Sequence, residues 1–514
     1  MTIAQHHAIR RQVLDVTVDG TEAEGLALQS RLVALCCDWL TSALDEALGR
    51  LVPGEEHWSI DRLDLDAGAF TVDSLERDLV GAVRTALENQ IRERLSGRGA
   101  SPRSSLGALA AERSRNGHTE WPSGGSSRED EGDDEFLRRT DAQATQDAFA
   151  HFLTTGVLPW WFRLPPNEPL EAVVSAAWNM EGRSFHAPST LRAIASPIAR
   201  LRLVRQFSEP FLEALLTILS PETARAAEEI ARWVTAHPGE TGRQQRLLER
   251  LWLLVFGAVS QHRVLSVEML FADWSRSVCA DVVTAPEDER VIADVARALS
   301  LPVPIASTEN KQGTSDASAR SPVSLPVAEA KRGMTSDDPQ TDSMRGMDLE
   351  DGIFVDSAGI VLLHPFLPAM FERLGVASEG KLILPDRALA LLHFLATSET
   401  RAPEYALVLP KLLCGLPLGQ PVGTPVELTE GEVAEAENLL AAVIGHWSAL
   451  SDASPDALRG TFLTRPGKLS CRDGDDLLQI EPQSFDVLLD RLPWGIGAIR
   501  LPWMDRMLWV EWRM

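Results

Sequence analysis

The chain has 514 residues, of which 44% are hydrophobic and 24% are charged, a composition suited to globular cores. This length exceeds what one hydrophobic core usually fills, so we expect two or three folded units. The 49 Lys and Arg residues against 74 Asp and Glu residues give a formal net charge of −25, which repels phosphate backbones and anionic membrane surfaces and argues against nucleic acid as a partner.

Cysteine usage and the N-terminal sequence bear on the compartment. The five cysteines include the adjacent pair Cys36 and Cys37 and follow no disulfide framework, which indicates a reducing cytoplasm. The opening MTIAQHHAIRRQVLDV has no apolar stretch followed by a small-residue cleavage site, so we predict no secretory signal. No apolar run approaches the roughly 20 residues that cross a bilayer, so we predict no membrane insertion.

Residues 1–97 are predicted to form a strand-helix-strand-helix unit. Apolar and polar residues alternate over 14–18, which is typical of a strand with one buried face. Thr21 and Glu24 have capping-box spacing, and helical periodicity then continues up to Pro53. The pattern predicts one helix of roughly 30 residues, about 45 Å long.

A second strand is predicted over 58–65, and a second helix follows it. Two strands alone make a marginal sheet, so we expect this unit to pair with itself, with a partner or with another part of the chain. The apolar stripe of the second helix has a spacing of three or four residues. The stripe consists of Leu75, Leu79, Val83, Leu87, Ile91 and Leu95.

Two low-complexity segments, 98–140 and 305–350, are rich in Gly, Ser, Pro and charged residues and offer little to bury, so we predict disordered linkers. Between them, 141–304 contains amphipathic stretches such as FLEALLTILS and is predicted to be a helical middle domain. Residues 351–514 are predicted to form a mostly helical C-terminal domain that ends in Trp-rich strands. The expected fold is therefore mainly α with small α+β parts.

The sequence contains no phosphate-binding GxxxxGK[ST], no GxSxG elbow and no HExxH zinc helix. The acidic residues Asp61, Asp64 and Asp66 offer oxygen ligands, but a calcium-binding EF-hand loop counted from Asp64 would have Gly and Glu where Ala69 and Leu75 stand. We interpret them as polar residues of a strand and its turn. We predict no enzyme, no catalytic residue, no metal and no cofactor.

Cysteine and histidine side chains are interpreted in the same way. His6 and His7 have no Cys or acidic partner at ligand spacing. Cys36 fits the apolar stripe of the first helix. Cys414 has Lys411 one helical turn away, and we predict packing at a helix end against Gly415 rather than thiol chemistry.

Two groups of the 14 tryptophans are candidate packing or partner-docking sites. Trp160 and Trp161 follow Gly156 and Pro159, and such a turn either buries two rings between helices or presents them as an anchor; burial is the interpretation we favour.

The second group lies at the C-terminus and consists of Trp494, Trp503, Trp509 and Trp512. Alternation in LWVEW places Trp509 and Glu511 on one face and Val510 and Trp512 on the other. So much apolar area is expected to dock on its own domain or on a partner.

Several segments of the sequence resemble one protein family. The opening IRRQVLDVTVDGTEAEGLALQSRL with HWSIDRLDLDAG, the middle FLTTGVLPWW and the closing GIVLLHPFLPAMFERLG, LVLPKLLCGLP and LPWGIGAIRLPWM resemble contractile injection system tape measure proteins. The resemblance touches all three predicted folded units and neither linker. It implies a structural role in extracellular phage-tail-like particles, with inner tube and baseplate proteins as partners and with control over how far the tube and sheath polymerise.

The resemblance also implies assembly in the bacterial cytoplasm and carriage within the released particle. With 31 Pro, two linkers and no long helical rod, the sequence resembles beads on a string. It leaves open whether length is measured by chain extension, with the linkers contributing to the span, or whether the chain is an assembly factor. A chaperone or adaptor that loads cargo and a toxin carried in the tube lumen are the alternatives from other classes.

Overall fold

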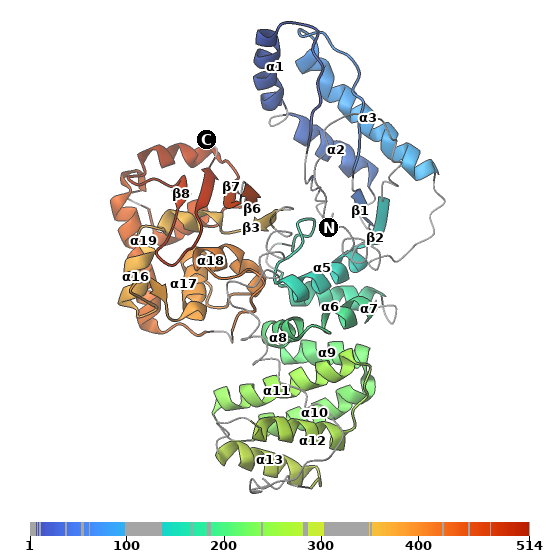
Figure 1. The fold of residues 1–514 in the computed structure, drawn as a ribbon, viewed down its shortest axis with the longest axis vertical. Coiled ribbons are helices and arrows are strands. Elements are labelled where there is room, and N and C mark those ends of the chain that lie inside the picture. Colours follow the sequence, from blue (N-terminus) through green and yellow to red (C-terminus); the bar gives the residue numbers. More distant parts are fainter. Residues whose placement is uncertain are drawn as a thin grey trace, which may run out of the picture. The chain divides into compact units, whose positions relative to one another are not determined.

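A computed structural model of the chain describes residues 7, 9, 12–35, 39–52, 56–60, 62–97, 136–165, 168–181, 187–237, 240–280, 286–302, 349, 352–423, 426–450, 453–472 and 474–512. The fold is mainly helical with strands in small sheets, as predicted (Figure 1). It divides into two compact units, Met1–Thr145 (unit 1) and Gln146–Met514 (unit 2). No described helix has the length and apolarity needed to cross a membrane.

Unit 1 contains α1 (Glu22–Leu35), α2 (Thr41–Leu51), β1 (Glu56–Ile60), α3 (Leu75–Gly97) and β2 (Phe136–Thr140). The predicted capping box is confirmed, because the Thr21 backbone N–H donates to Glu24 Oε2 at 2.8 Å and the Glu24 N–H donates to Thr21 Oγ1 at 3.4 Å. Where one helix of roughly 30 residues was expected, two helices are described. Residues 36–38, which include Cys36 and Cys37, lie outside the described residues.

The strand predictions for unit 1 were partly wrong. Residues 12–18 form no strand, and Val16 is 45% exposed, because no described strand pairs with this segment and alternation alone supplies no ladder. The second strand is β1, which begins two residues before the predicted start and ends at Ile60. Its antiparallel partner is β2, at the end of the segment predicted as the first linker. The expected pairing is thus made with another part of the chain.

The apolar stripe of α3 packs as predicted. Leu87 and Ile91 are buried against α2, where they share a core with Leu44 and Ala47. The earlier half of the stripe packs with α1 in a second small core around Leu79. The side chain of Leu95 lies outside the described residues.

The first part of unit 2, residues 146–302, is here called the helical part. Capping residues mark the starts of several of its helices. At the helix that begins at Glu209, for example, Ser208 accepts a hydrogen bond from the Phe211 N–H, and Pro210 occupies the first turn. The core is rich in aromatic rings, with Phe207 stacked on Phe211 at 4.5 Å. The helices are α5 (Asp141–Thr155), which begins in unit 1, α6 (Leu170–Glu181), α7 (Ala187–Ala193), α8 (Pro197–Gln206), α9 (Glu209–Leu219), α10 (Pro221–Ala236), α11 (Thr241–Ser260), α12 (Val267–Cys279) and α13 (Pro286–Ala298).

The second part of unit 2, residues 349–512, is here called the C-terminal part. Its helical elements are η3 (Ala358–Leu363), α16 (Leu367–Arg373), α17 (Pro385–Thr397), η4 (Glu404–Leu407), α18 (Val408–Leu413), α19 (Glu430–His446), η5 (Ser448–Leu450), α20 (Pro455–Leu458), η6 (Arg459–Leu463) and η7 (Ser484–Arg491). Its strands are β3 (Ile353–Val355), β4 (Ala377–Ser378), β5 (Lys381–Leu382), β6 (Gly467–Arg472), β7 (Asp475–Ile480), β8 (Ala498–Ile499) and β9 (Leu508–Trp512).

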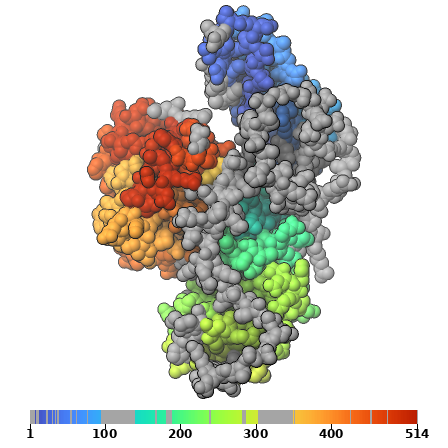
Figure 2. Space-filling model, viewed as in Figure 1, coloured from blue at the N-terminus to red at the C-terminus, as the bar shows by residue number. Residues whose placement is uncertain are grey.

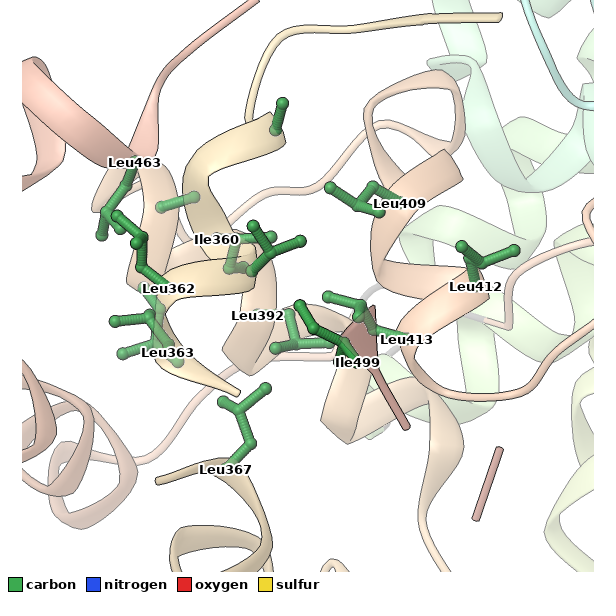
Figure 3. Packing of buried hydrophobic residues seen from close by; sticks show 14 of the residues in the cluster. Ile360, Leu362, Leu363, Leu367, Leu392, Leu409, Leu412, Leu413, Leu463 and Ile499 are labelled. Atoms are coloured by element: carbon green, nitrogen blue, oxygen red, sulfur yellow. The ribbon is translucent and has the colours of Figure 1, made fainter. Parts of the chain in front are cut away.

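The C-terminal part contains a five-stranded sheet with the strand order β3-β6-β7-β9-β8. The β7 and β9 strands are parallel, with Leu478 opposite Val510, and the other neighbours are antiparallel. The short terminal strands predicted from the sequence are therefore present. Beside the sheet, aliphatic side chains from η3, α16, α17, α18 and η6 converge on one core (Figure 3).

The helical part and the C-terminal part each have their own core. In the space-filling view the described surface of the helical part is mostly green and that of the C-terminal part is orange to red (Figure 2). The two cores also interlock. Val157 of the helical part is buried in the C-terminal core, while Tyr405 of the C-terminal part packs on the helical core. The Tyr405 ring meets Phe152 edge to face at 5.9 Å. The predicted middle and C-terminal domains, 141–304 and 351–514, thus share one compact unit from Gln146 onward.

Candidate functional site

Trp503 packs the C-terminal segment against the core of the C-terminal part. Its indole N–H donates to the Leu413 carbonyl at 2.8 Å, and its ring stacks on Phe371 at 5.5 Å. Gly415 makes this approach possible, because a Cβ there would lie 2.7 Å from the Trp503 carbonyl oxygen and because its φ of +67° favours glycine. Trp503 is therefore a packing residue.

Trp494 makes a second attachment of the same kind. Its indole N–H donates to the Leu362 carbonyl at 3.1 Å, and its ring meets Phe366 edge to face at 5.2 Å. Both tryptophans satisfy their N–H groups at the ends of buried helices, as half-buried indoles usually do.

The β9 strand presents one tryptophan to the surface. Trp509 is 43% exposed, and its indole N–H donates to Asp475 Oδ2 at 3.0 Å. Glu511, on the same face, accepts from Arg472 at 2.7 Å and from Gln479 at 2.8 Å. Val510 is buried, so the predicted alternation of the two faces is confirmed.

Trp512 lies half-buried on the inner face of β9, beside a buried ion pair. The Arg465 guanidinium is 5.5 Å from the Trp512 ring and donates to both carboxylate oxygens of Asp486, at 2.7 and 3.1 Å. Burial raises the pKa of Asp486, but hydrogen bonds from Arg465 and from the Gln483 N–H outweigh it and hold the pKa below its usual value. The pair ties η7 to the segment just before β6.

Trp160 and Trp161 lie in a turn closed by the Phe162 N–H, which donates to the Pro159 carbonyl at 3.0 Å. Both rings are half-buried, and Trp161 meets Phe162 edge to face at 6.1 Å. They lie outside the group formed by Trp494, Trp503 and Trp512, which packs on the C-terminal core. Full burial between helices, which the sequence favoured, and binding to a partner, which was the alternative, both stay predictions for these two rings.

A buried charge cluster that sequence reasoning missed joins the two parts of unit 2. Arg202 of α8 and Glu404 of η4 are 0% exposed, and Lys411 of α18 is 2% exposed. Glu404 Oε1 accepts from Arg202 Nε at 3.0 Å and from Lys411 Nζ at 2.7 Å. A single carboxylate therefore holds a cation from each part.

Backbone carbonyl groups complete the charge cluster. Lys411 Nζ donates to the Leu418 and Gln420 carbonyls at 2.8 and 2.7 Å, and Arg202 Nη2 donates to the Gly419 carbonyl at 2.7 Å. Burial lowers the pKa of Lys411, and the Glu404 carboxylate only partly opposes that effect. The cluster holds two cations and one anion away from water.

Gly156 packs directly against this cluster, where a side chain would have no room. Its φ is +85°, and a Cβ there would lie 2.7 Å from Glu404 Oε1 and 2.8 Å from Arg202 Nη2. Glycine is thus required both by the backbone conformation and by space. One signal was visible in the sequence, since Glu404 and Lys411 stand seven residues apart in an otherwise apolar stretch.

Among the residues considered for metal or thiol chemistry, those that the structure describes have structural roles. Asp64 pairs with Arg62 at 3.0 Å, and Asp66 Oδ1 accepts the Gly68 N–H at 2.9 Å, while Asp61 lies outside the described residues. Within the described part of the chain, no group of three or more His, Cys, Asp or Glu could hold a metal ion. Cys414 is buried, which raises the pKa of its thiol, so the packing interpretation is confirmed.

Comparison with known proteins identifies the family. Residues 5–512 match the family model described as contractile injection system tape measure protein. The match spans nearly the whole chain, so the chain belongs to this family. It therefore has a structural role in the assembly of an injection system, in which it takes part in determining tube length. No curated protein and no solved structure matches the chain.

Proposed function

We propose that the chain is a non-enzymatic assembly protein that binds inner tube and baseplate proteins while the tube grows in the bacterial cytoplasm. The observation that carries this proposal is the buried charge cluster of Arg202, Glu404 and Lys411, which makes one body of two parts far apart in sequence. Such a body offers a fixed surface on which other subunits can assemble.

The buried carboxylates support a structural role rather than a chemical one. Glu432 caps α19, where it accepts the Thr429 N–H at 2.7 Å, and it also accepts from Arg387. Glu404 and Asp486 are likewise bound to cations and enclosed in the fold. A general acid or base has to reach a substrate, whereas these groups connect one element of the chain to another.

We assign partner docking to the outer face of β9, around Trp509. An exposed indole beside Asp475 and the Arg472–Glu511 ion pair combines a large apolar ring with charged neighbours. Tryptophan is enriched among the residues that dominate protein interfaces. The ring is held on β9, which is paired on both sides, by β7 and by β8, so binding costs little backbone freedom.

The docking assignment is tested with purified Trp509→Ala protein and the tube and baseplate proteins of a strain that makes particles. We expect the variant to keep its stability and to capture at least tenfold less tube or baseplate protein than wild type. Val487→Ala is the matched control, because Val487 is also apolar and is 62% exposed on η7. Equal capture by wild type and Trp509→Ala would exclude this surface as the docking site.

The chain is also proposed to remain in the released particle. Mass spectrometry of purified particles is expected to detect it at a constant ratio to the tube subunit. Its absence from finished particles, combined with stoichiometric capture of a cargo protein, would instead support the loading chaperone. Activity assays on the purified chain should show no hydrolase or transferase activity that one polar-to-Ala substitution abolishes.

A further inference from the structure

The segment of unit 1 that precedes α1, residues 12–18, exposes apolar side chains to solvent. Val13, Leu14 and Val16 are 69%, 38% and 45% exposed. Within the described part of the chain, no backbone N–H or C=O group of 12–18 takes part in a hydrogen bond. A segment with unpaired backbone groups and exposed apolar side chains is a template for a strand of another chain.

The C-terminal end of this segment is fixed to unit 1. Val18 packs on the small core that contains Leu28 and Leu79. Thr21 and Glu24 then form the capping box at the start of α1. Because one end is already held, the segment loses less freedom when a partner strand pairs with it than a free terminus would.

The sequence of the segment is complementary to a second copy of itself. When two copies run antiparallel with Val16 opposite Val16, Leu14 lies opposite Val18 and Asp15 lies opposite Thr17. The apolar side chains of both copies then share one face, and no charge lies opposite a like charge. Both copies use the same residues, as a two-fold interface requires.

Other registers of the same pair fit less well. A pair centred on Asp15 places the two Asp15 carboxylates opposite each other, and a pair centred on Thr17 places Asp15 opposite Asp19. Like charges directly opposite are destabilising. A pair centred on Leu14 leaves Val18 without an apolar partner, and any pairing of odd with even positions places Asp15 opposite an apolar side chain. The centre at Val16 is therefore the favoured one.

We propose that residues 12–18 bind a second copy of this chain as an antiparallel strand pair with its two-fold axis at Val16. Each copy contributes backbone hydrogen bonds and an apolar face. The formal net charge of −25 on each copy opposes association, so salt should strengthen it. The inference goes beyond the proposed function, because it concerns the chain with itself and not the docking of tube or baseplate proteins.

Charged replacements of Val16 test the position of the two-fold axis. Sedimentation of the purified full chain is expected to show a species of twice the chain's 56.3 kDa. Val16→Asp and Val16→Lys each place like charges opposite one another, so each should weaken dimerisation at least tenfold, whereas an equimolar mixture of the two should recover it. Val72→Asp is the matched control, because Val72 is 52% exposed in the same unit but outside the segment, and it should dimerise like wild type.

Disulfide cross-linking tests the register, in a chain whose exposed Cys279 and Cys471 are replaced by Ser. Val16→Cys should give a cross-linked dimer under mild oxidation, because opposite Cβ atoms lie about 4.5–5.5 Å apart. Leu14→Cys and Val18→Cys should not cross-link alone, since each lies about 13 Å along the strands from its own copy. A mixture of these two variants should cross-link. The chain without an introduced cysteine measures the background.

Several results would overturn the proposal. A full chain that sediments only as a monomer at high salt would do so, and so would a dimer that both charged variants leave intact. Failure of their mixture to recover the dimer, or cross-linking of Leu14→Cys to itself, would exclude the axis at Val16. Capture of a tube protein by wild type but not by Val16→Asp, without any dimer, would assign the segment to another partner. Because cross-linking uses uncharged replacements, it decides the register even if a charged variant does not fold.

Discussion

Trp503 and Trp509 have the same side chain in opposite environments. Trp503→Ala removes a ring stacked on Phe371 and leaves the Leu413 carbonyl without its donor. Since the ring is half-buried, we expect a loss of about 2–4 kcal/mol in unfolding free energy, at or below the range for a fully buried ring. Trp509→Ala should cost less than about 1 kcal/mol. Urea denaturation of both variants measures the difference, and equal losses would contradict the assignment of Trp503 to packing.

The ion pair of Asp486 with Arg465 makes the stability of the folded chain depend on pH. Its pKa in the folded chain is lowered from 3.8, so its pairing with Arg465 contributes stability that is fully present above that value. The contribution is lost as the pH falls through the lowered folded pKa. We expect Asp486→Asn to be about 3 kcal/mol less stable than wild type at neutral pH.

The difference between wild type and Asp486→Asn should then shrink as the pH is lowered below about 4, because wild-type Asp486 also loses its charge there. Denaturant titrations at a series of pH values measure it. A difference that stays constant down to the acid limit would show that the charge of Asp486 is not what stabilises the fold.

At the level of elements, η3 and η6 pack backbone against backbone. A Cβ on Gly359 would lie 1.6 Å from the Phe462 carbonyl oxygen, whereas a Cβ on Gly460 would meet no atom within 4 Å. We expect Gly359→Ala to lose at least about 3 kcal/mol, because both elements are buried and one of them has to move. Gly460→Ala should change stability by less than about 1 kcal/mol. Thermal melts of the two variants provide the comparison, and a tolerated Gly359→Ala would refute this close packing.

Local patterns in the sequence predicted local structure well. The Thr21–Glu24 capping box and the α3 stripe from Leu75 to Ile91 are present as expected, because hydrogen bonds and packing within a few turns determine them. The alternation in LWVEW was also correct, since Val510 is buried and Trp509 is exposed.

Pairing between distant segments was not predictable from one sequence. Alternation over 14–18 had the period of a strand but lacks a described partner, whereas β2 pairs with β1 from a position that composition assigned to a linker. Strand formation depends on a neighbour as much as on the strand's own residues. Arg202 and Glu404 lie 202 residues apart, so nothing in the local sequence of either one indicates the other.

At the scale of the whole molecule, two low-complexity segments suggested three separate beads, but both segments begin and end within a compact unit. Composition reports whether a segment offers residues to bury and says nothing about where its ends are held. The ends are held by β1 with β2 in unit 1 and by the interlocked cores of unit 2.

We predict that Glu404 contributes more than any other single side chain of the charge cluster to holding the two parts of unit 2 together. Glu404→Ala leaves the cations of Arg202 and Lys411 in the interior without their shared carboxylate, so we expect a loss of about 3–5 kcal/mol. Glu399→Ala is the matched control, because Glu399 is 71% exposed and should cost less than about 1 kcal/mol. Urea denaturation with probes in each part should show one transition in wild type and two in Glu404→Ala.

The combined replacement of Arg202, Glu404 and Lys411 by Met, Leu and Met separates pairing from packing. With no buried charge left unpaired, it should recover most of the stability that Glu404→Ala loses, because apolar replacements of a whole buried ion cluster are often nearly neutral. If Glu404→Ala instead unfolds with wild-type midpoint and in a single transition, the cluster does not join the two parts. If the combined variant is as unstable as Glu404→Ala, the loss comes from the packing of these side chains and from their hydrogen bonds to the Leu418, Gly419 and Gln420 carbonyls rather than from stranded charge.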